Sequence, residues 1–372
     1  MICYHHTDMD GKSAGWLVHT LHPSTIEDFA ESYIPTNYGD KFDKHTEKDD
    51  VFIVDVSISA TSYNDFLNVC KTARTVTWID HHQTSLDIIK EHEDELQAID
   101  NLTYFVSKCA CGAALTYTFF NIPRDYLSAI RQISENEKYL IKADYLKGGI
   151  ISVNMRKMDP KHPEDALYHC WKVTLPKWLF HVDDYDTWKQ IDPLTNTLIL
   201  GVDTEDTSLV IDGEGRNSER KVFNPFWNRF TTDMNAISEY IAYGKSIDRY
   251  IKSKYARELG STFEWEYNGI KFICKNAHGN SWNFGELIKN YPAAILFNYD
   301  GKSGKWDYSV YSDESSSFDC SAFCKLFGGG GHIHASGFQI KDLIFLKTPR
   351  KTDNIIFLGG TVDDNWRTKF IS

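Results

Sequence analysis

Val76-Thr77-Trp78-Ile79-Asp80-His81-His82 is a short apolar run that ends on one acid and two imidazoles. Because four apolar or β-branched residues in a row leave no position for a solvent-facing side chain, the run predicts a strand buried on both faces. Val51-Phe52-Ile53-Val54-Asp55 repeats this pattern, and segments with helical spacing separate the apolar runs of the first half. The alternation predicts an α/β domain with a parallel sheet and helices on both faces. Asp55 and Asp80 would then lie at the carboxyl ends of strands, where open α/β sheets bind their ligands.

Helices are predicted wherever apolar residues recur at intervals of three and four. In the first half these segments are Lys12–Leu21, Tyr63–Ala73, Gly112–Phe120 and Asp125–Lys142. The stretch from Asp233 to about Leu259 predicts one long connecting helix. Beyond it, Asn268-Gly269 separates two strand-like runs, which is the strongest short signal of a two-residue hairpin. The strands expected there are Phe263–Tyr267, Ile270–Cys274, Ala293–Phe297 and Trp306–Tyr311.

The length of 372 residues predicts two domains. Polar and glycine-rich sequence between about Val202 and Phe226 marks the candidate boundary. We expect an N-terminal parallel-sheet domain at 1–215, a linker and connecting helix at 216–260, a smaller C-terminal α/β domain at 261–345, and a tail at 346–372. We also expect the active site in the cleft between the two domains.

The charge balance limits the kinds of partner. Lys and Arg number 40 against 52 Asp and Glu, a formal net charge of −12. Proteins that follow long nucleic acids normally show a basic groove, so the acidic balance argues against long duplex DNA and for a small or short ligand. No apolar run approaches the roughly 18 residues that span a bilayer, and the first residues lack the basic and apolar segments of a secretory signal. We therefore expect a cytoplasmic protein with no membrane partner. Its eight cysteines lack zinc-knuckle spacing and are expected to be unpaired, mostly buried thiols.

His6-Thr7-Asp8-Met9-Asp10-Gly11 is the most specific motif in the chain. It follows a short apolar strand and precedes a helix, and residues two apart on an extended segment point to one face. His6, Asp8 and Asp10 can therefore converge on cations, because imidazole together with carboxylates suits Mn²⁺ or Mg²⁺. Gly11 would let the backbone turn sharply. The alternative is a polar turn in which an aspartate only caps the helix.

Three further groups strengthen the metal interpretation. Asp80-His81-His82 places three ionisable groups at the end of a buried strand, which is costly unless something charged occupies the space between them. Asp55 adds a carboxylate on another strand. The segment Asp183–Trp188 concentrates carboxylates around aromatic side chains, and at least one carboxylate could complete a metal shell. Taken alone, the histidines could instead be a hydrogen-bonded pair and the aspartates a solvated loop.

Gly328-Gly329-Gly330-Gly331-His332 lies far downstream, shortly before Ala335-Ser336-Gly337. Consecutive glycine N–H groups can cradle a phosphate, and His332 can donate a hydrogen bond to it. A flexible linker is the alternative, which the packed apolar sequence on both sides disfavours. The second domain is also rich in aromatic residues that could stack on bases. These residues are Phe297, Tyr299, Trp306, Tyr308 and Tyr311.

Taken in order, these motifs resemble the DHH phosphoesterase superfamily with its DHH-associated C-terminal domain. Within it, the chain is most similar to the nanoRNase-type oligoribonucleases, in the His6 to Gly11 opening, the Tyr185–Trp188 stretch and the Gly328–Gly337 stretch. The similarity covers about residues 1 to 340. It departs where relatives often carry an arginine before the glycine loop, since this chain has Val310-Tyr311-Ser312.

The resemblance implies two Mn²⁺ ions, with Mg²⁺ as the alternative metal. His6, Asp8 and Asp55 would hold the first ion, and Asp10, Asp55, His81 and Asp186 the second, with Asp55 bridging. The catalytic residues would be Asp80, His81 and His82, where Asp80 orients or supplements the shell and His82 faces the scissile phosphate. Gly329, Gly330, Gly331 and His332 would bind the far part of the substrate. Asp184 is a less specific neighbour of the site than Asp186.

The activity implied by the resemblance is a phosphodiesterase that cleaves short oligonucleotides to mononucleotides, as an exonuclease of the oligoribonuclease kind. A two-metal-activated water would be the nucleophile. Two alternatives stay open: a phosphodiesterase for cyclic or linear signalling dinucleotides, and a nucleotide-binding module without turnover. Pyrophosphate is disfavoured as a substrate because the aromatic residues suit bases. The sequence leaves open the preference for RNA or DNA, the direction of cleavage and a homodimer.

Overall fold

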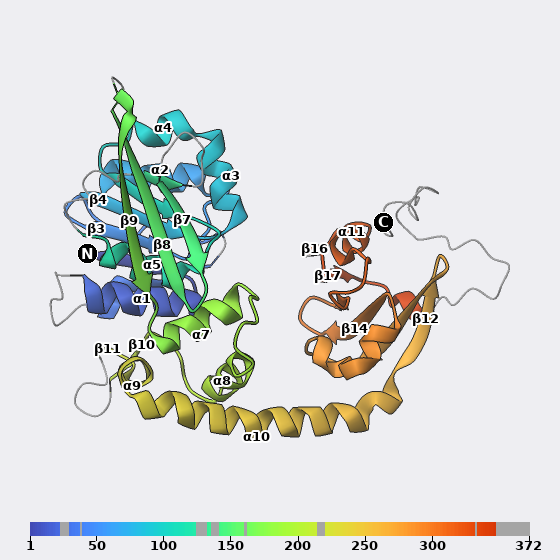
Figure 1. The fold of residues 1–372 in the computed structure, drawn as a ribbon. Helices are drawn as coiled ribbons and strands as arrows, with labels where there is room; N and C mark the ends of the chain where they lie inside the picture. The colour runs from blue at the N-terminus through green and yellow to red at the C-terminus, as the bar shows by residue number, and fades with distance from the viewer. Residues whose placement is uncertain are drawn as a thin grey trace. The chain divides into compact units, whose positions relative to one another are not determined.

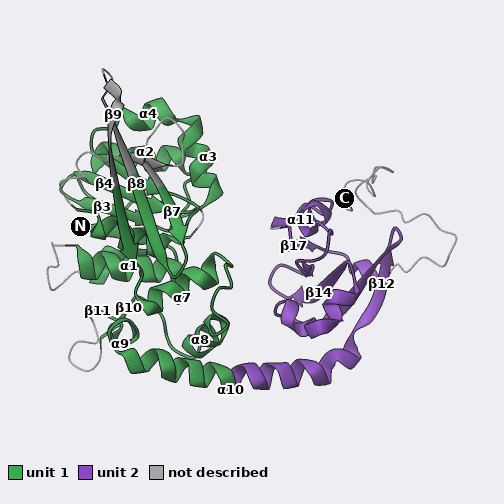
Figure 2. Cartoon of the chain, in the orientation of Figure 1, with its two compact units in different colours: residues 1–246 green, residues 247–372 purple. Residues whose placement is uncertain are grey.

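The computed structural model describes residues 1–22, 30–37, 39–123, 132–134, 141–159, 162–213, 220–331 and 333–346. The chain forms two compact units, Met1–Ser246 and Ile247–Ser372 (Figure 2). The division falls inside helix α10 (Met234–Glu258), which contributes residues to both units. Each unit has its own sheet and its own core (Figure 1).

A six-stranded parallel sheet forms the centre of unit 1. Its order is β2-β1-β3-β4-β5-β6, and every neighbouring pair runs parallel. The strands are β1 (Ile2–His5), β2 (Tyr33–Pro35), β3 (Asp50–Val54), β4 (Thr75–Asp80), β5 (Leu102–Val106) and β6 (Gln132–Ser134). The two apolar runs that predicted buried strands are confirmed as β3 and β4, and the parallel-sheet domain is confirmed with them.

Helices cover both faces of this sheet, because successive side chains on each strand point to opposite sides. Phe52 and Val54 belong to the core that contains α1 (Met9–Leu21) and α5 (Gly112–Asn121). Val51 and Ile53 belong to the core that contains α2 (Tyr63–Thr72), α3 (Gln83–Glu91) and α4 (Glu93–Gln97). Burial on both sides explains why these strands are apolar throughout.

A second, antiparallel sheet of unit 1 was not predicted. It consists of β7 (Ile141–Leu146), β8 (Ile150–Asp159) and β9 (His162–Thr174), in that order. The helix predicted at Asp125–Lys142 is wrong wherever its residues are described, because β6 pairs with β5 and β7 pairs with β8. The rest of that prediction lies outside the described residues. Pairing with strands elsewhere in the chain outweighed a local helical spacing, as tertiary context often does.

The chain after β9 turns mainly helical. The elements of unit 1 there are α7 (Lys177–Asp186), α8 (Thr195–Val202), β10 (Val210–Asp212), β11 (Lys221–Phe223), α9 (Pro225–Thr232) and the first part of α10. Two glycines let α8 and α10 approach closely: a Cβ added at Gly201 would lie 1.9 Å from the Tyr240 carbonyl oxygen, and one added at Gly244 would lie 1.7 Å from the Thr197 carbonyl oxygen. The long helix predicted at Asp233 to Leu259 is confirmed as α10.

Unit 2 is built on a six-stranded mixed sheet in the order β12-β13-β14-β15-β17-β16. The strands are β12 (Phe263–Tyr267), β13 (Ile270–Asn276), β14 (Ala293–Asp300), β15 (Lys305–Tyr311), β16 (Gly330–Gly331) and β17 (Ala335–Ile340). Helix α11 (Cys320–Lys325) packs into an aromatic core, while η4 (Ser281–Asn290) packs with a second, smaller cluster. Short 3-10 turns complete the described chain as η1 (Ala30–Ser32), η3 (Leu259–Ser261) and η5 (Ile344–Leu346).

The hairpin predicted at Asn268-Gly269 is confirmed. Both residues have positive φ, 50° and 80°, which the tight turn between β12 and β13 requires. The smaller C-terminal α/β domain is likewise confirmed. None of the eight cysteines is in a disulfide, and six of them are buried. Of the helices within the described ranges, none combines the length and apolar character needed to cross a membrane.

We expect Gly201→Ala to lower the free energy of unfolding by about 1–3 kcal/mol, the usual cost of forcing extra volume into a packed interface. The added methyl group would collide with the Tyr240 carbonyl oxygen on α10, which cannot rotate away. Urea denaturation followed by circular dichroism measures the change. Gly260→Ala is the matched control, because nothing lies within 4 Å of its added Cβ. Equal stability of the two variants would contradict the proposed close contact.

Candidate metal centre

The segment between β1 and α1 presents the first group of polar side chains. His6 Nδ1 lies 2.7 Å from Asp8 Oδ2, and Asp8 Oδ1 accepts a hydrogen bond of 2.8 Å from the N–H of Gly11. Asp8 therefore caps α1 and contacts His6 at the same time. A helix-capping role and a metal-binding role for this aspartate are thus compatible. A Cβ added at Gly11 would lie 2.4 Å from the His6 carbonyl oxygen. Gly11 lies within helix α1, so its role is close packing rather than the sharp turn expected from the sequence.

Asp10 lies in the first turn of α1, not on an extended segment as expected. Its carboxylate accepts hydrogen bonds from the N–H groups of Gly112 (2.7 Å) and Ala113 (2.8 Å), the first residues of α5. The positive end of the α5 dipole thus faces this buried carboxylate. His6, Asp8 and Asp10 therefore come together because α1 begins at this point, and not because alternate residues of a strand share a face.

Asp55 directly follows β3 and is buried, with φ of 57°. Positive φ is uncommon for a residue with a side chain. Its Oδ2 lies 3.9 Å from His6 Nδ1 and its Oδ1 lies 3.2 Å from His81 Nε2. Oδ1 is buried and accepts no hydrogen bond. A Cβ added at Gly112 would meet the Asp55 side chain at 2.6 Å, so only glycine fits there.

Asp80 ends β4 and fixes the orientation of His82. Asp80 Oδ1 lies 2.7 Å from His82 Nδ1, and Asp80 Oδ2 accepts a hydrogen bond from the Ser85 hydroxyl. Ser85 Oγ also accepts a hydrogen bond of 3.1 Å from the N–H of Ile58. The backbone at Ile58 therefore fixes Ser85, which in turn fixes Asp80 and His82. Burial acts to lower the pKa of His82, but the hydrogen bond to Asp80 and the negative charges of Asp80, Asp10 and Asp186 together outweigh it and raise the pKa to about 8.

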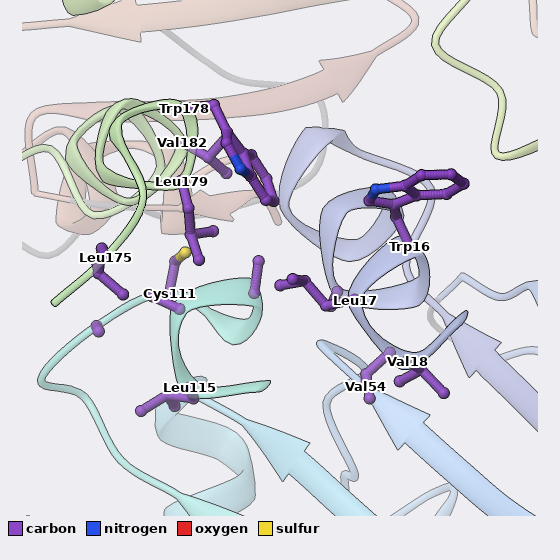
Figure 3. Close-up of a cluster of buried hydrophobic side chains, with 14 of the residues drawn as sticks. Trp16, Leu17, Val18, Val54, Cys111, Leu115, Leu175, Trp178, Leu179 and Val182 are labelled. Carbon is purple, nitrogen blue, oxygen red and sulfur yellow. The ribbon is translucent and has the colours of Figure 1, made fainter. Parts of the chain in front are cut away.

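Helix α7 brings in the last carboxylate. Trp178, Leu179 and Val182 anchor α7 in the same buried cluster as Leu17 of α1 and Cys111, which precedes α5 (Figure 3). Asp186 at the end of α7 then lies with its Oδ2 3.5 Å from His81 Nε2. That nitrogen is also 3.7 Å from Asp10 Oδ2, so three carboxylates from distant segments surround it.

The two other aspartates of α7 have structural partners. Asp183 accepts hydrogen bonds from the N–H of Cys111 and from Lys189 Nζ, each at 2.8 Å. Asp184 accepts hydrogen bonds from the N–H groups of Ile191 and Asp192 and from the Thr195 hydroxyl. Neither residue belongs to the metal-binding groups found in the described part of the chain. Asp184, expected as a secondary neighbour of the site, instead holds the loop that follows α7.

The pKa values of the site carboxylates shift in two directions, because burial and neighbouring negative charges raise them while hydrogen bonds and the charges of histidines lower them. Burial raises the pKa of Asp55, and the negative charges of Asp10 and Asp8 raise it further. Burial also raises the pKa of Asp186 to about 8, again with Asp10 and Asp8 adding to it. Burial acts the same way on Asp8 and Asp80, but their hydrogen bonds and the charges of the nearby histidines together outweigh it and lower both pKa values. Of these four aspartates, Asp55 and Asp186 therefore have the negative charges that other groups of the protein stabilise least.

The donor set fits divalent cations. Three groups of possible ligand atoms lie within 4.8 Å of one another, namely His6 with Asp8 and Asp55, Asp10 with His81 and Asp186, and Asp55 with His81 and His82. Asp186 Oδ2, like Asp55 Oδ1, is buried without a hydrogen-bond partner. Two unpartnered carboxylate oxygens among nitrogen and oxygen donors are what a hard or borderline cation would satisfy.

The glycine stretch of unit 2 differs from the open cradle expected from the sequence. The N–H of Gly328 donates to the Lys325 carbonyl oxygen and that of Gly329 to the Cys324 carbonyl oxygen, so both are used within the chain. Gly330 and Gly331 form β16 against β17. His332 lies outside the described residues, and the assignment of this stretch to substrate binding stays a prediction.

Two of the five aromatic residues of unit 2 that were expected to stack on bases lie in its core instead. Phe297 and Tyr308 are buried in the core of unit 2, where they hold the sheet together. Tyr299 is 57% exposed. The aromatic pattern at Phe297 and Tyr308 therefore indicated core packing and not a surface for a ligand.

Several residues of the site were missed by sequence reasoning. Ser85, which supports Asp80, gave no signal because it lies within an ordinary helix. Gly112 could have been noticed, since it starts a predicted helix directly after Cys111. Lys189 follows the acidic segment and lies 3.9 Å above the Tyr145 ring while it pairs with Asp183.

The fold and the site together define a parallel α/β domain of the kind that binds divalent metal at the carboxyl ends of its strands. Residues 1–151 match the DHH family, N-terminal domain. This part of the chain, which contains β1 to β7, is therefore similar to the DHH family, whose phosphoesterases depend on divalent metal.

Individual proteins are more distant. The chain is 25% identical over 185 residues to the uncharacterized protein R106 of Acanthamoeba polyphaga mimivirus, in an alignment that covers 45% of this chain and 38% of that protein. The matched part thus spans well under half the length of this curated relative. Among solved structures, a pGpG-specific phosphodiesterase, PggH from Vibrio cholerae, has a TM-score of 0.38 at 12% identity and covers 91% of this chain and 93% of its own. The DHH domain of a member of the s1p family of ribosomal proteins has a TM-score of 0.43 at 13% identity and covers 90% and 81%.

We expect Asp55→Asn to raise the thermal midpoint of the metal-free protein, because an amide relieves repulsion and can donate to neighbouring carboxylates. Asp10→Ala should instead cost about 1–3 kcal/mol, since it leaves two buried N–H groups of α5 unsatisfied. Calorimetry in EDTA measures both. A larger loss for Asp55→Asn than for Asp10→Ala would contradict this account of the charges.

Proposed function

We propose that this protein is a metal-dependent phosphodiesterase that hydrolyses short oligonucleotides to mononucleotides, in the manner of oligoribonucleases. Hydrolysis adds water across one P–O ester bond, and the ester oxygen leaves as an alcohol that carries a proton. Bound as a pair, two Mn²⁺ ions supply a water of lowered pKa and offset charge on the phosphate oxygens. The protein's own residues would hold the two ions, orient His82 and position the substrate.

The observation that carries this proposal is the buried Asp55 carboxylate. It belongs to two groups of candidate ligands, one with His6 and Asp8 and one with His81 and His82, and its Oδ1 has no hydrogen-bond partner. A carboxylate shared in this way suits a bridge between two ions. In the proposed assignment, His6, Asp8 and Asp55 hold one ion and Asp10, Asp55, His81 and Asp186 hold the other.

The hydrogen bonds within the site support separate roles for the remaining residues. Asp80 has both oxygens engaged, by His82 and Ser85, so it orients rather than supplements the metal shell. His82, fixed through Nδ1, faces the scissile phosphate and can donate a hydrogen bond to it. Gly329, Gly330, Gly331 and His332 remain the proposed contacts for the far part of the substrate.

The proposed substrate is short because of the net charge. A formal charge of −12 gives no basic path for a long duplex. A short chain of nucleotides instead needs only the metal centre and a few contacts beside it. We also propose that the protein acts in the cytoplasm, and Mg²⁺ is the alternative metal.

A panel of substrates tests the proposal. Purified full-length protein is dialysed against EDTA, supplied with Mn²⁺ or Mg²⁺, and given labelled linear dinucleotides, five-residue oligonucleotides and cyclic dinucleotides. We expect Mn²⁺-dependent release of mononucleotides from the linear species. Asp55→Asn should lower kcat/KM by more than the roughly 10- to 100-fold that an outer-shell partner costs.

Asp212→Asn is the matched control, because Asp212 is an exposed aspartate paired with Lys221 on the surface of unit 1. It should leave the rate unchanged. Absence of cleavage with every divalent ion would replace the enzyme by a nucleotide-binding module. A preference for cyclic species would move the assignment to signalling dinucleotides.

Ser85→Ala tests the support behind His82. We expect kcat to fall about 10- to 100-fold, as for other outer-shell partners, while the Mn²⁺-induced rise in thermal midpoint is kept. Ser57→Ala is the control, since Ser57 contacts Ser85 only at 3.4 Å and does not bond to Asp80. Loss of the Mn²⁺-induced shift in Ser85→Ala would show a structural effect on the metal site instead.

A further inference from the structure

The loop that follows α7 is held in an unusual backbone conformation. Trp188 and Gln190 have φ of 52° and 50°, a region that residues with side chains seldom occupy and that clusters at functional sites. Of the four non-glycine residues with positive φ in the described chain, these are two, and a third is Asp55. Asp184 fixes the loop through the N–H groups of Ile191 (2.7 Å) and Asp192 (3.1 Å).

This backbone turns an aromatic side chain out to solvent. Trp188 is 66% exposed and Tyr185 is 41% exposed. Lys189, between the two positive-φ residues, turns inward to Asp183 and the Tyr145 ring. A large ring held on a fixed loop loses little entropy on binding, so it is ready to stack on a planar ligand.

A pocket of about 220 Å³ opens beside Trp188. Its wall includes Tyr185, Trp188, Gln190, Pro193 and Asn196. Pockets for drug-sized ligands measure on the order of 300–1,000 Å³, so this one suits a single ring system rather than a whole nucleotide. It offers two amide side chains for hydrogen bonds at the edge of such a ring.

The charges of the pocket favour a neutral ring over a phosphate group. The described residues that line it include Asp184 and Asp192 but no Lys or Arg. Asp184 is already occupied by its loop contacts, and Asp192 Oδ1 accepts a hydrogen bond from the N–H of Leu194. An anion would meet repulsion here. A base with exocyclic N–H donors would not.

The pocket adjoins the metal centre along the chain. Asp186, a proposed metal ligand, lies between Tyr185 and Trp188, and its Cα is within about 7 Å of the Cα of Trp188. This short separation along the chain is the reason for assigning the pocket and the metal centre to one ligand.

We propose that Tyr185, Trp188, Gln190 and Asn196 form a subsite for one nucleobase of the substrate, with Trp188 as its stacking platform. This inference rests on the proposed function, since it names the part of the substrate that this face of unit 1 recognises. It assigns base recognition to the loop after α7, within the same unit as the metal ligands.

Binding without turnover tests the subsite. Full-length protein with Mn²⁺ is titrated by calorimetry with AMP, which has no phosphodiester bond to cleave, and with ribose 5-phosphate. We expect AMP to bind more tightly, and Trp188→Ala to weaken AMP about 10- to 100-fold, as loss of one base–aromatic stack does, with no effect on ribose 5-phosphate. Ile191→Ala is the control, because Ile191 is also exposed but does not line the pocket.

A second measurement does not depend on the variant. Stacking on Trp188 should quench the fluorescence of a 2-aminopurine nucleotide added to the unmodified protein, and excess AMP should reverse the quenching. Equal binding of AMP and ribose 5-phosphate, or AMP binding unaffected by Trp188→Ala, would overturn the inference.

Hydrolysis separates this inference from the function on which it rests. With a linear dinucleotide and Mn²⁺, Trp188→Ala should raise KM and leave kcat close to its original value. Cleavage with unchanged KM in Trp188→Ala would keep the enzyme and remove the subsite. Trp188-dependent AMP binding in a protein that cleaves nothing would keep the subsite and remove the enzyme.

Discussion

Repulsion among five carboxylates gathered near the carboxyl ends of one parallel sheet is the constraint on which the rest of unit 1 depends. The fold answers part of it internally. Asp10 faces the N-terminus of α5, Asp8 caps α1 beside His6, and Asp80 lies between His82 and Ser85. Asp55 and Asp186 each keep a buried oxygen without a hydrogen-bond partner. Since burying such charge is costly, the arrangement is most stable when cations share those oxygens. The helices around the site therefore stabilise three of the carboxylates, and they leave an oxygen of Asp55 and one of Asp186 available to a cation.

The sequence predicted those parts of the fold in which local pattern and tertiary environment agree. Val51–Val54 and Val76–Ile79 consist of apolar or β-branched residues because both faces of the parallel sheet are covered, and Asn268-Gly269 can adopt the two positive φ values of its turn. Where the two disagree, the prediction failed. The segment 125–142 has helical spacing, yet its described residues form β6 and β7, because β6 pairs with β5, some 26 or more residues earlier in the chain, and β7 pairs with β8, which follows it directly. Local spacing holds no information about such partners.

The candidate site could be predicted residue by residue, but not its supports. The motifs indicated which segments carry the acids and imidazoles, and the resemblance to the DHH superfamily selected His6, Asp8, Asp10, Asp55, His81 and Asp186 from them as side chains that meet. Their supports are backbone N–H groups and glycines, which carry no distinctive side chain. Gly112 is needed because Asp55 lies against it, and that contact spans 57 residues of sequence. The same limit misassigned Phe297 and Tyr308, because an aromatic residue in a strand looks alike in a core and on a binding surface.

Three aspartates on the last turn of α7 perform three different tasks, and their order has a consequence for how the gene can change. Asp183 supports the start of α5, Asp184 fixes the following loop, and Asp186 points to His81. Each residue of an α-helix turns the next by about 100°. Insertion or deletion of one residue in this turn would rotate the carboxylates beyond it by about 100° away from their partners, so this segment should vary in related proteins by substitution and hardly ever by length.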